Sequence, residues 1–457
     1  MAIRTGRIVV AGLSSSSGKT TVSVALMSAL KRRGYSVMPY KVGPDFIDTK
    51  YHEIASGNYS YNLDGFMTSA DYIRKKVASR EADGTVSVIE GVMGLYDGVK
   101  ASSDFGSTAW VARLLGAPVL CVIDVGAMMR TVLAIADGIR YSLEKRGISL
   151  AGFVLNRTGG DAHYEQCRRI LVRNGYRVFG HIPFNADLEI GERHLGLKFG
   201  DIEAMKLAVE KISAFAEQTL DIDRIAQAYM KFKYTGLPKP HVVRRKRSKC
   251  RIAVPVDQAF NFYYRENLEL LERAGAEIVT FQLINSQLPE KIQGLYIGGG
   301  YPELFADTIS SKRKLLDEIV TMANEGIPIY AECGGYMLLS RTLRDASGRT
   351  FRMAGLFDTE IEMQNRPTIG YRCVEFKEDS FMGDRNMSAR GHEFHYAIEK
   401  VNSERKAFKM FLPGTNKYLD CGAKKYNAIG SFVHLHFSSN PNIYRRFINS
   451  CISPSSS

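Results

Sequence analysis

The sequence has no apolar run of the roughly 18 residues that a membrane-spanning helix needs, and no apolar segment of the secretory kind near its N-terminus. We therefore expect a cytoplasmic protein that makes no use of a membrane. Cysteine is scarce as well: the seven cysteines are widely spaced and form no C-x-x-C pair. This spacing excludes the usual structural zinc sites and the disulfide framework of small secreted domains.

Internal repeats are absent too, and low complexity is confined to the serine-rich tail from Ser453. At 457 residues the chain is too long for one hydrophobic core, while 45% apolar and 24% charged residues are the proportions of a globular protein. We expect two main domains, at residues 1–235 and 251–452. They are joined by a linker at 236–250 and followed by a disordered tail at 453–457.

The net charge of +13 raises the question of a nucleic-acid partner, and residues 244–249 form a basic run that would serve one. This run follows the proline-containing stretch 236–240 and precedes a new strand pattern, so we interpret it as a solvated linker. We expect no nucleic-acid partner. The excess of positive charge also suits the capture of a polyanionic substrate.

Strand and helix patterns alternate along both domains, which predicts an α/β protein with parallel sheets covered by helices on both faces. The strands expected in the first domain are 7–11, 36–40, 86–89, 119–124, 152–155 and 177–180, with a helix at 131–146. Those expected in the second domain are 251–256, 277–281, 294–297 and 327–331, with a more antiparallel end near 351–376 and 391–400.

A phosphate-binding loop follows the first expected strand. Gly12 is followed by a run of serines and then by Gly18-Lys19-Thr20-Thr21, which opens a helix pattern. In such a P-loop the backbone N–H groups surround a phosphate, the lysine reaches the outer phosphates, and the hydroxyl of Thr20 binds Mg²⁺. Gly12 stands one place earlier than in the common G-x-x-x-x-G-K-T spacing, but serine side chains are small enough for the backbone to approach the ligand.

Four carboxylates follow the ends of two further strands. Asp45 and Asp48 come after the strand expected at 36–40, and Glu90 and Asp97 come after the one expected at 86–89. Ligands of an open parallel sheet bind at the carboxyl ends of its strands, where the phosphate loop also lies. We therefore expect these side chains to converge on Mg²⁺ and on a reacting group. For Asp48 and Asp97, a role in a turn or a helix cap is the open alternative.

A candidate nucleophile lies in the second domain. Cys333 follows the strand expected at 327–331 and precedes Gly334-Gly335 and an amphipathic helix pattern, so we expect it on a strand-to-helix turn with its sulfur exposed. The helix dipole and a nearby protonated histidine would lower its pKa below the usual value of about 8.5. His434 is the candidate base. By themselves the two residues are compatible with a protease, a hydrolase or a transferase.

Five further motifs resemble those of the cobyrinic acid a,c-diamide synthase family. They are KVGPDFID at 41–48, NLD at 62–64, EGVMGLYDG at 90–98, ERHLGL at 192–197 and GHEFHY at 391–396. The resemblance covers nearly the whole chain and includes motif order, linker position and length. It extends to a close relative, the enzyme that amidates nickel sirohydrochlorin, and these motifs do not separate the two.

The resemblance implies a carbon–nitrogen ligase with two centres. A first domain similar to dethiobiotin synthetase would use ATP and Mg²⁺ to convert an acetate of the corrinoid into an acyl phosphate. A second domain similar to class I glutamine amidotransferases would release ammonia from glutamine, and ammonia would then displace the phosphate. Repeating the cycle would amidate both the a and c acetates of cobyrinic acid in cobalamin biosynthesis. A homodimer is left open.

The roles of individual residues follow from this resemblance and from the loop chemistry. Cys333 is expected as the nucleophile and His434 as the general base, and the amides of Gly299 and Gly300 are expected to hold the oxyanion. The residues expected to bind ATP are Gly12, Ser17, Gly18, Lys19, Thr20, Thr21 and Asn156. Thr20, Asp45 and Glu90 are expected to bind Mg²⁺, and Asp48 and Asp97 to position the substrate; the roles of the three aspartates are interchangeable.

Three points stay open at this level. His436 occupies the place where many amidotransferases carry the glutamate of their catalytic triad, so the group that orients His434 is not identified. Diamidation of nickel sirohydrochlorin for the methanogenic nickel cofactor is an alternative function. A non-enzymatic, nucleotide-dependent corrinoid-binding protein, in which Cys333 is dispensable, is a second alternative.

Overall fold

The computed structural model describes residues 5–184, 202–229, 248–415 and 417–453. The chain divides into two compact units, unit 1 with Met1–Leu197 and Asp201–Val242, and unit 2 with Lys198–Gly200 and Val243–Ser457. Several expected features lie outside the described residues: the motif at 192–197, most of the linker with its basic run, and the end of the tail.

Unit 1 contains a sheet of seven parallel strands in the order β3-β2-β4-β1-β5-β6-β7. Its strands are β1 Gly6–Gly12, β2 Ser36–Val42, β3 Tyr61–Leu63, β4 Thr85–Glu90, β5 Val119–Asp124, β6 Leu150–Thr158 and β7 Val178–Pro183. Its helices are α1 Lys19–Arg32, α2 Ile47–Ser56, α3 Ala70–Ala78, α4 Thr108–Leu115, α5 Val132–Glu144, α6 Asp161–Arg173, α7 Ile202–Thr219 and α8 Ile222–Tyr229. The parallel α/β sheet predicted for the first domain is confirmed.

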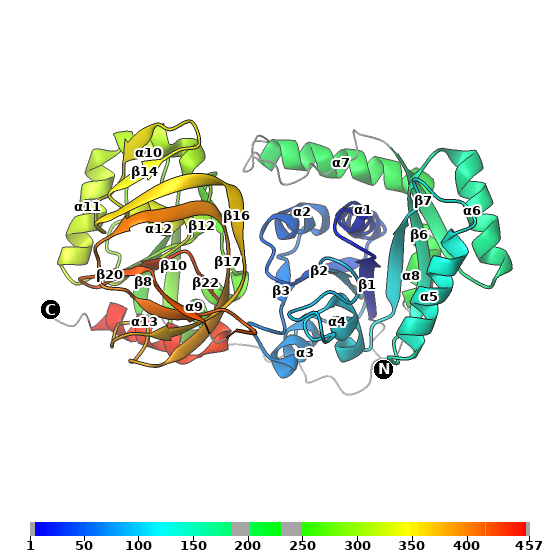
Figure 1. The fold of residues 1–457 in the computed structure, drawn as a ribbon, viewed down its shortest axis with the longest axis horizontal. Coiled ribbons are helices and arrows are strands. Elements are labelled where there is room, and N and C mark those ends of the chain that lie inside the picture. The colour runs from blue at the N-terminus through cyan, green and yellow to red at the C-terminus, as the bar shows by residue number, and fades with distance from the viewer. Residues whose placement is uncertain (1–4, 185–201, 230–247, 416, 454–457) are drawn as a thin grey trace. The chain divides into compact units, whose positions relative to one another are not determined.

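The sheet of unit 1 is apolar on both faces, as a doubly covered parallel sheet must be. Along β1, Ile8 and Val10 face one core while Val9 and Ala11 face the other. Helices α1, α2, α7 and α8 pack on the first face and α3, α4, α5 and α6 on the second. Figure 1 shows α1, α2 and α7 on one side of the sheet and α3 and α4 on the other. The carboxyl ends of β1, β2 and β4 therefore bring the phosphate loop and both acidic motifs to one edge.

Unit 2 has a six-stranded sheet in the order β10-β8-β11-β13-β21-β20, parallel except for its last pair, and a second, largely antiparallel sheet with β15-β14-β16-β17-β22 and the β18–β19 pair. Its strands are β8 Cys250–Pro255, β9 Phe260–Phe262, β10 Ala276–Phe281, β11 Gly294–Ile297, β12 Gly299–Gly300, β13 Ile329–Glu332, β14 Thr342–Arg344, β15 Thr350–Arg352, β16 Thr359–Phe376, β17 Ser388–Asn402, β18 Phe408–Phe411, β19 Tyr418–Cys421, β20 Ala423–Lys425, β21 Ala428–Ser431 and β22 His434–Leu435. Its helices are α9 Arg265–Ala274, α10 Ala306–Ser311, α11 Arg313–Asn324, α12 Gly334–Leu339 and α13 Asn442–Ile452, with 3-10 turns η2 Pro302–Phe305 and η3 Phe437–Ser439.

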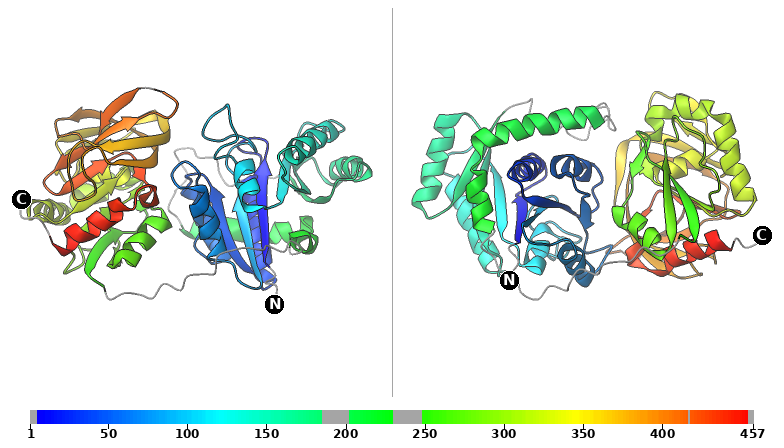
Figure 2. Two further views of the ribbon diagram at one scale, coloured as in Figure 1. Left: turned by 90° about the horizontal axis from the view of Figure 1, so that it is seen from below. Right: turned by 180° about the vertical axis from the view of Figure 1, so that it is seen from behind.

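Two cores lie on the two faces of the six-stranded sheet. Helices α10, α11 and α12 belong to one core, and α9 and α13 to the other. Figure 2 shows the red helix α13 and the yellow-green helices α10 and α11 against different sides of this unit. The predicted α/β sheet with an antiparallel end is confirmed. In the described parts of the chain, no helix has the length and apolar character needed to cross a bilayer.

Candidate active sites

The phosphate loop in unit 1 is closely packed against the end of β6. Gly18 has φ of 92°, and a Cβ atom at this position would lie 2.3 Å from Nδ2 of Asn156. The same Asn156 amide donates a hydrogen bond of 3.0 Å to the carbonyl oxygen of Ser17. At the loop's start, a Cβ atom on Gly12 would lie 2.1 Å from Oγ of Ser17. Both glycines are therefore required by close approach, and Asn156 belongs to the loop's support.

Lys19 lies at the N-terminus of α1 and is folded back onto its own loop. Its Nζ donates to the carbonyl oxygen of Ser14 at 2.6 Å. Burial, together with the positive charge of Lys41, lowers the pKa of Lys19 to about 8. An ammonium group whose charge is disfavoured by burial and by a second cation is stabilised by an anion beside it. This arrangement fits the phosphates of a nucleotide, whose negative charge would return the pKa of Lys19 toward its usual range.

Glu90, at the end of β4, is the centre of a buried polar cluster. Its Oε1 accepts hydrogen bonds from Thr20 Oγ1 at 2.7 Å and Lys41 Nζ at 2.6 Å. Its Oε2 lies 2.6 Å from Nε2 of His52 on α2. Burial of the fully inaccessible Glu90 opposes ionisation, but Lys41 and His52 hold its pKa well below the usual range. Glu90 is therefore a carboxylate at neutral pH.

The three aspartates occupy different places near this cluster. Asp45 Oδ1 accepts from the backbone N–H groups of Ile47 at 2.8 Å and Asp48 at 3.0 Å, so it caps the start of α2. Asp48 is paired with Lys41 at 2.5 Å, and burial and the charge of Asp45 raise its pKa. Asp97 Oδ2 accepts from the N–H of Gly94 at 3.0 Å within the loop after β4. Asp48 is thus joined to Glu90 through Lys41, while Asp45 and Asp97 shape loops.

The same edge of the sheet contains two oxygen-bearing side chains that are suitable ligands for Mg²⁺. Protein sites for Mg²⁺ commonly use one or two carboxylates, a hydroxyl and the phosphates of the substrate, and keep several waters. The Thr20 hydroxyl and the Glu90 carboxylate meet this requirement at 2.7 Å from each other. Among the described residues there is no group of three or more His, Cys, Asp or Glu side chains of the kind that would hold a metal without a substrate.

In unit 2, Cys333 lies on a strained turn between β13 and α12, as predicted. Its backbone has φ of 48° and ψ of −103°, a conformation that costs about 1–3 kcal/mol in a non-glycine residue. The turn is held by hydrogen bonds from the Cys333 N–H to Ser431 O at 2.8 Å and from Met337 N–H to Cys333 O at 3.0 Å. Glycine is needed two positions further on, since a Cβ atom on Gly335 would lie 2.4 Å from Ile297 O.

The expectation that Cys333 is exposed and has a lowered pKa is wrong. The residue is only 4% exposed. Burial, and next to it the charge of Glu303, raises the pKa of the thiol, and the N–H of Gly334, which donates to the sulfur, only partly opposes this. The following helix has six residues, so its dipole is short. Cys333 therefore rests as a thiol and needs a base to become a nucleophile.

His434 and Cys333 both lie against Gly299. A Cβ atom on this glycine would be 2.4 Å from Cε1 and 3.2 Å from Nε2 of His434, and 3.4 Å from Cβ of Cys333. Only glycine fits here, because a side chain would collide with the imidazole of His434. Gly300 lies close to the nucleophile as well, because its backbone nitrogen is 3.0 Å from a Cβ atom placed on Gly334. The structure thus brings together the four residues expected in the second centre.

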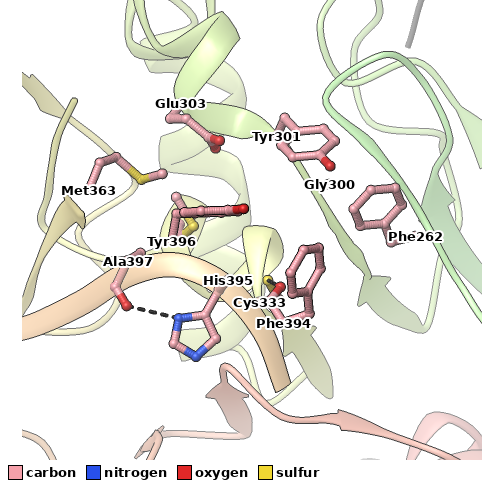
Figure 3. Close-up of a pocket in the computed structure, with 11 residues that line it drawn as sticks. Phe262, Gly300, Tyr301, Glu303, Cys333, Met363, Phe394, His395, Tyr396 and Ala397 are labelled. Carbon is pink, nitrogen blue, oxygen red and sulfur yellow. Dashed lines mark hydrogen bonds between the residues drawn. The ribbon is translucent and has the colours of Figure 1, made fainter. Parts of the chain in front are cut away.

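A small pocket opens beside the thiol. Figure 3 shows Cys333, Glu303 and Tyr396 among the side chains around it. The residues that line it are Phe262, Gly300, Tyr301, Glu303, Cys333, Met337, Met363, Phe394, His395, Tyr396 and Ala397. Glu303 is the only carboxylate among these lining residues, and burial raises its pKa to about 7. Of the two histidines in the motif at 391–396, His395 lines the pocket and His392 stacks on His434 with ring centroids 5.0 Å apart.

Sequence reasoning missed three residues of these sites. Lys41 opens the motif at 41–48 and Glu332 directly precedes Cys333, but neither spacing nor residue type distinguished them from ordinary strand residues. His52 lies in α2, where a single histidine carries no pattern. Each of the three becomes visible only through its buried partners, which are Glu90 for Lys41 and His52, and a pair of tyrosines for Glu332.

Two family matches correspond to the two units. Residues 8–197 match the CobQ/CobB/MinD/ParA nucleotide binding domain, and residues 251–442 match the CobB/CobQ-like glutamine amidotransferase domain. The fold, the phosphate loop and the Cys333–His434 pair agree with this division. The class is therefore a glutamine amidotransferase joined to a nucleotide-binding ligase domain.

Similar proteins match along nearly their whole length. A cobyrinate a,c-diamide synthase from Picrophilus torridus is 39% identical over 97% of this chain and 98% of its own. One from Caldanaerobacter subterraneus is 37% identical over 97% of this chain and 98% of its own, and one from Dehalococcoides mccartyi is 37% identical over 97% of both. The chain belongs to the cobyrinate a,c-diamide synthase family. These names favour a corrinoid over the nickel alternative.

Proposed function

We propose that this protein amidates the a and c acetate side chains of cobyrinic acid or a similar corrinoid, with ATP and glutamine as co-substrates. A carboxylate is a poor electrophile, so its oxygen must become a leaving group before an amine can add. Ammonia is mostly protonated near neutral pH and is then not nucleophilic, so it has to be released close to where it is used. Two centres in one chain meet these two needs.

In unit 1 the substrate's own acetate attacks the γ-phosphate. The protein positions the two reactants and neutralises the charge on the phosphates. The loop amides and Lys19 hold the phosphates, with Asn156 keeping Gly18 and the Ser17 carbonyl in place. Thr20, Glu90 and Asp45 would hold Mg²⁺, which when bound would help to neutralise the charge on the transferring phosphoryl group. Asp48, paired with Lys41, and Asp97 position the substrate. ADP is released, and the acetate becomes an acyl phosphate.

In unit 2, Cys333 attacks the side-chain amide of glutamine. The thiol proton passes to His434, the S–C bond forms, and the tetrahedral oxyanion is held by backbone amides of Gly299 and Gly300. His434 then returns the proton to the leaving nitrogen, the C–N bond breaks, and ammonia is released. Water hydrolyses the thioester to glutamate and restores the thiol. Ammonia displaces phosphate from the acyl phosphate to form the amide.

The pocket beside Cys333 supports this assignment of the substrate. Glutamine presents an α-ammonium group at the end opposite the reacting amide, and a carboxylate in the pocket is the natural partner of that cation. Glu303 is the carboxylate that lines the described pocket. We assign it to the α-ammonium group, and the aromatic rings of Tyr301, Phe394 and Tyr396 to the walls around the carbon chain.

The observation that carries the proposal is the placement of His434 and Cys333 against the same glycine, Gly299, in a chain whose other unit has Lys19 folded onto a phosphate loop. A hydrolase or protease needs the first arrangement but not the second. A nucleotide switch needs the second but not the first. Mg²⁺ as cofactor, a homodimer and a cytoplasmic location remain parts of this proposal.

The experiment supplies purified protein with ATP, Mg²⁺, glutamine and cobyrinic acid, and determines the product masses and the ADP released. We expect two amides per corrinoid. Cys333→Ser should lose glutamine-dependent synthesis and retain synthesis from added ammonium. Equal glutamine use by wild type and Cys333→Ser would refute the amidotransferase assignment, and a parallel incubation with nickel sirohydrochlorin tests the macrocycle. Binding of corrinoid and nucleotide without turnover would favour the non-enzymatic alternative.

A further inference from the structure

A buried carboxylate lies next to His434, on the residue directly before the nucleophile. Glu332 Oε2 is 3.8 Å from Nδ1 of His434, and each side chain is only 1% exposed. This distance is longer than a hydrogen bond, but contacts between catalytic groups commonly tighten only when substrate binds. A Cβ atom on Gly299 would lie near Cε1 and Nε2 of this imidazole and near Cys333, whereas the carboxylate lies near Nδ1.

Three donors hold Glu332 in this position. Its Oε1 accepts from Tyr330 Oη at 2.7 Å and from the backbone N–H of Leu435 at 2.9 Å. Its Oε2 accepts from Tyr296 Oη at 2.9 Å. Burial, with the charge of Glu332, raises the pKa values of both tyrosines well above the usual range, so both remain donors. Since Leu435 follows His434 in β22, the same carboxylate ties the strand of the base to the strand of the nucleophile.

His436, which stands where other amidotransferases carry the glutamate that orients the histidine, makes other contacts. His436, two positions after His434, directs Nδ1 to the hydroxyl of Ser438 at 2.8 Å, and its ring lies 4.9 Å from that of Tyr264. A histidine in that place supplies no carboxylate. His392, which stacks on His434, has a pKa held well below the usual range by burial and by the positive groups around it, so it is neutral and adds no positive charge beside His434.

We infer that Glu332 is the positioning residue for His434, in place of the glutamate that other amidotransferases carry after the histidine. Its carboxylate accepts a hydrogen bond from the Nδ1–H of His434, so Nε2 stays unprotonated and takes the proton of the Cys333 thiol. The imidazolium formed in this step is then stabilised by Glu332 until the proton passes to the leaving ammonia. The inference rests on the proposed glutaminase function.

The test substitutes Glu332→Gln, which keeps the size of the side chain. The amide oxygen still accepts from Tyr330 and Leu435, and the Tyr296 hydroxyl, which donates to Oε2 in wild type, can turn to accept from the amide NH₂. The NH₂ now faces Nδ1 as a donor and favours the wrong tautomer of His434. We expect kcat for glutamine hydrolysis to fall roughly 10²- to 10⁴-fold, with KM for glutamine within about threefold of wild type. The matched control is His436→Gln, which should change kcat by less than about threefold.

A spectroscopic measurement separates positioning from a purely structural role. The measurement is NMR of the full-length protein labelled with ¹⁵N-histidine, in which the signals of His434 are assigned by their disappearance in His434→Gln. We expect the Nδ1–H tautomer of His434 in wild type and the Nε2–H tautomer in Glu332→Gln. A wild-type Nε2–H tautomer would overturn the inference even if Glu332→Gln does not fold. So would an unchanged kcat in Glu332→Gln, or an equal loss in His436→Gln. Absence of Cys333-dependent glutaminase in wild type would instead refute the proposed function, while the tautomer still decides the role of Glu332.

Discussion

Lys41 and Glu90 form a buried ion pair in unit 1, with Nζ 2.6 Å from Oε1. The same ammonium group lies 2.5 Å from Oδ2 of Asp48. Burial disfavours the charge on Lys41, but Asp48 and Glu90 together raise its pKa above the usual range. One cation therefore compensates the two carboxylates at the edge of the sheet where the phosphate loop lies.

Replacing Lys41→Met should both destabilise unit 1 and stop synthesis. Breaking a buried pair typically costs about 3–5 kcal/mol, because it leaves an uncompensated buried charge. Glu90 would take up a proton or rearrange, and its interaction with Thr20 at the proposed Mg²⁺ site would be lost. We expect a lower midpoint in urea unfolding and no ATP-dependent amidation with ammonium, while glutamine hydrolysis by unit 2 persists.

The matched control is Lys75→Met, which breaks the pair between Lys75 and Asp71 on α3. Its atoms are 2.8 Å apart, but the two side chains are 65% and 68% exposed. Such a pair contributes about 0–1 kcal/mol, so stability and synthesis should stay close to wild type. Equal losses of stability and of synthesis in the two variants would mean that the Lys41 ion pair contributes no more than an exposed pair does.

Much of the fold was predictable because its strands are continuously apolar and its helices amphipathic. The expected strands 119–124 and 294–297 coincide with β5 and β11, and the others mostly extend by a few residues at their ends. The short strands β3, β9 and β12 were not predicted. Strands of two or three residues carry no usable period, and their pairing depends on contacts that are distant in sequence.

The sites were predictable in residue identity more than in physical state. The strand-to-helix turn at Cys333 follows from two glycines after an apolar strand, but the burial that raises its pKa depends on side chains from other segments. Likewise, Glu332 looks like a polar residue at a strand end. Its position beside His434 is determined by Tyr296 and Tyr330, which lie on two neighbouring strands.

Nucleotide binding should take up a proton above pH 8. The pKa of Lys19 is about 8 without a ligand, so the amine is largely neutral at pH 8.5. Phosphates favour its charged form and raise this pKa, so about half a proton or more should be bound per nucleotide at pH 8.5, and almost none through this group at pH 7. Calorimetric titrations with ATP and Mg²⁺ in two buffers of different ionisation enthalpy measure the uptake.

Lys19→Arg provides the control for this titration. Arginine remains charged throughout the range, so the uptake at pH 8.5 should disappear even where the variant still binds nucleotide. Proton uptake that persists in Lys19→Arg would assign the effect to another group. Uptake that is equal at pH 7 and pH 8.5 would contradict the lowered pKa of Lys19.

Glutamine binding should weaken as the pH falls through 7. Burial raises the pKa of Glu303 to about 7, so its carboxylate is present above this pH and is progressively lost below it. Only the charged form pairs with the α-ammonium group, so KM for glutamine should rise up to about tenfold per pH unit below 7 and level off above it. Steady-state glutaminase assays between pH 5.5 and 8.5 provide the profile.

Glu303→Gln removes the titrating group without changing the size of the side chain. At pH 8 we expect KM for glutamine to rise roughly 10- to 100-fold, the equivalent of losing a hydrogen bond to a charged group worth about 1.5–3 kcal/mol. The dependence of KM on pH should also become flat in this range. If the variant keeps the wild-type KM at pH 8, Glu303 does not bind the α-ammonium group of glutamine.

Gly18→Ala and Gly34→Ala compare two glycines with similar backbones and different surroundings. Their φ angles are 92° and 82°, so alanine brings comparable backbone strain of about 1 kcal/mol at either position. A Cβ atom on Gly34 meets nothing within 4 Å, whereas one on Gly18 would lie 2.3 Å from Nδ2 of Asn156.

We expect Gly34→Ala to lose a little stability and keep its affinity for ATP. Gly18→Ala should displace Asn156 and weaken ATP binding by tenfold or more in the same calorimetric assay, with glutamine hydrolysis unchanged. Equal affinities in the two variants would mean that the contact between Gly18 and Asn156 does not shape the phosphate loop.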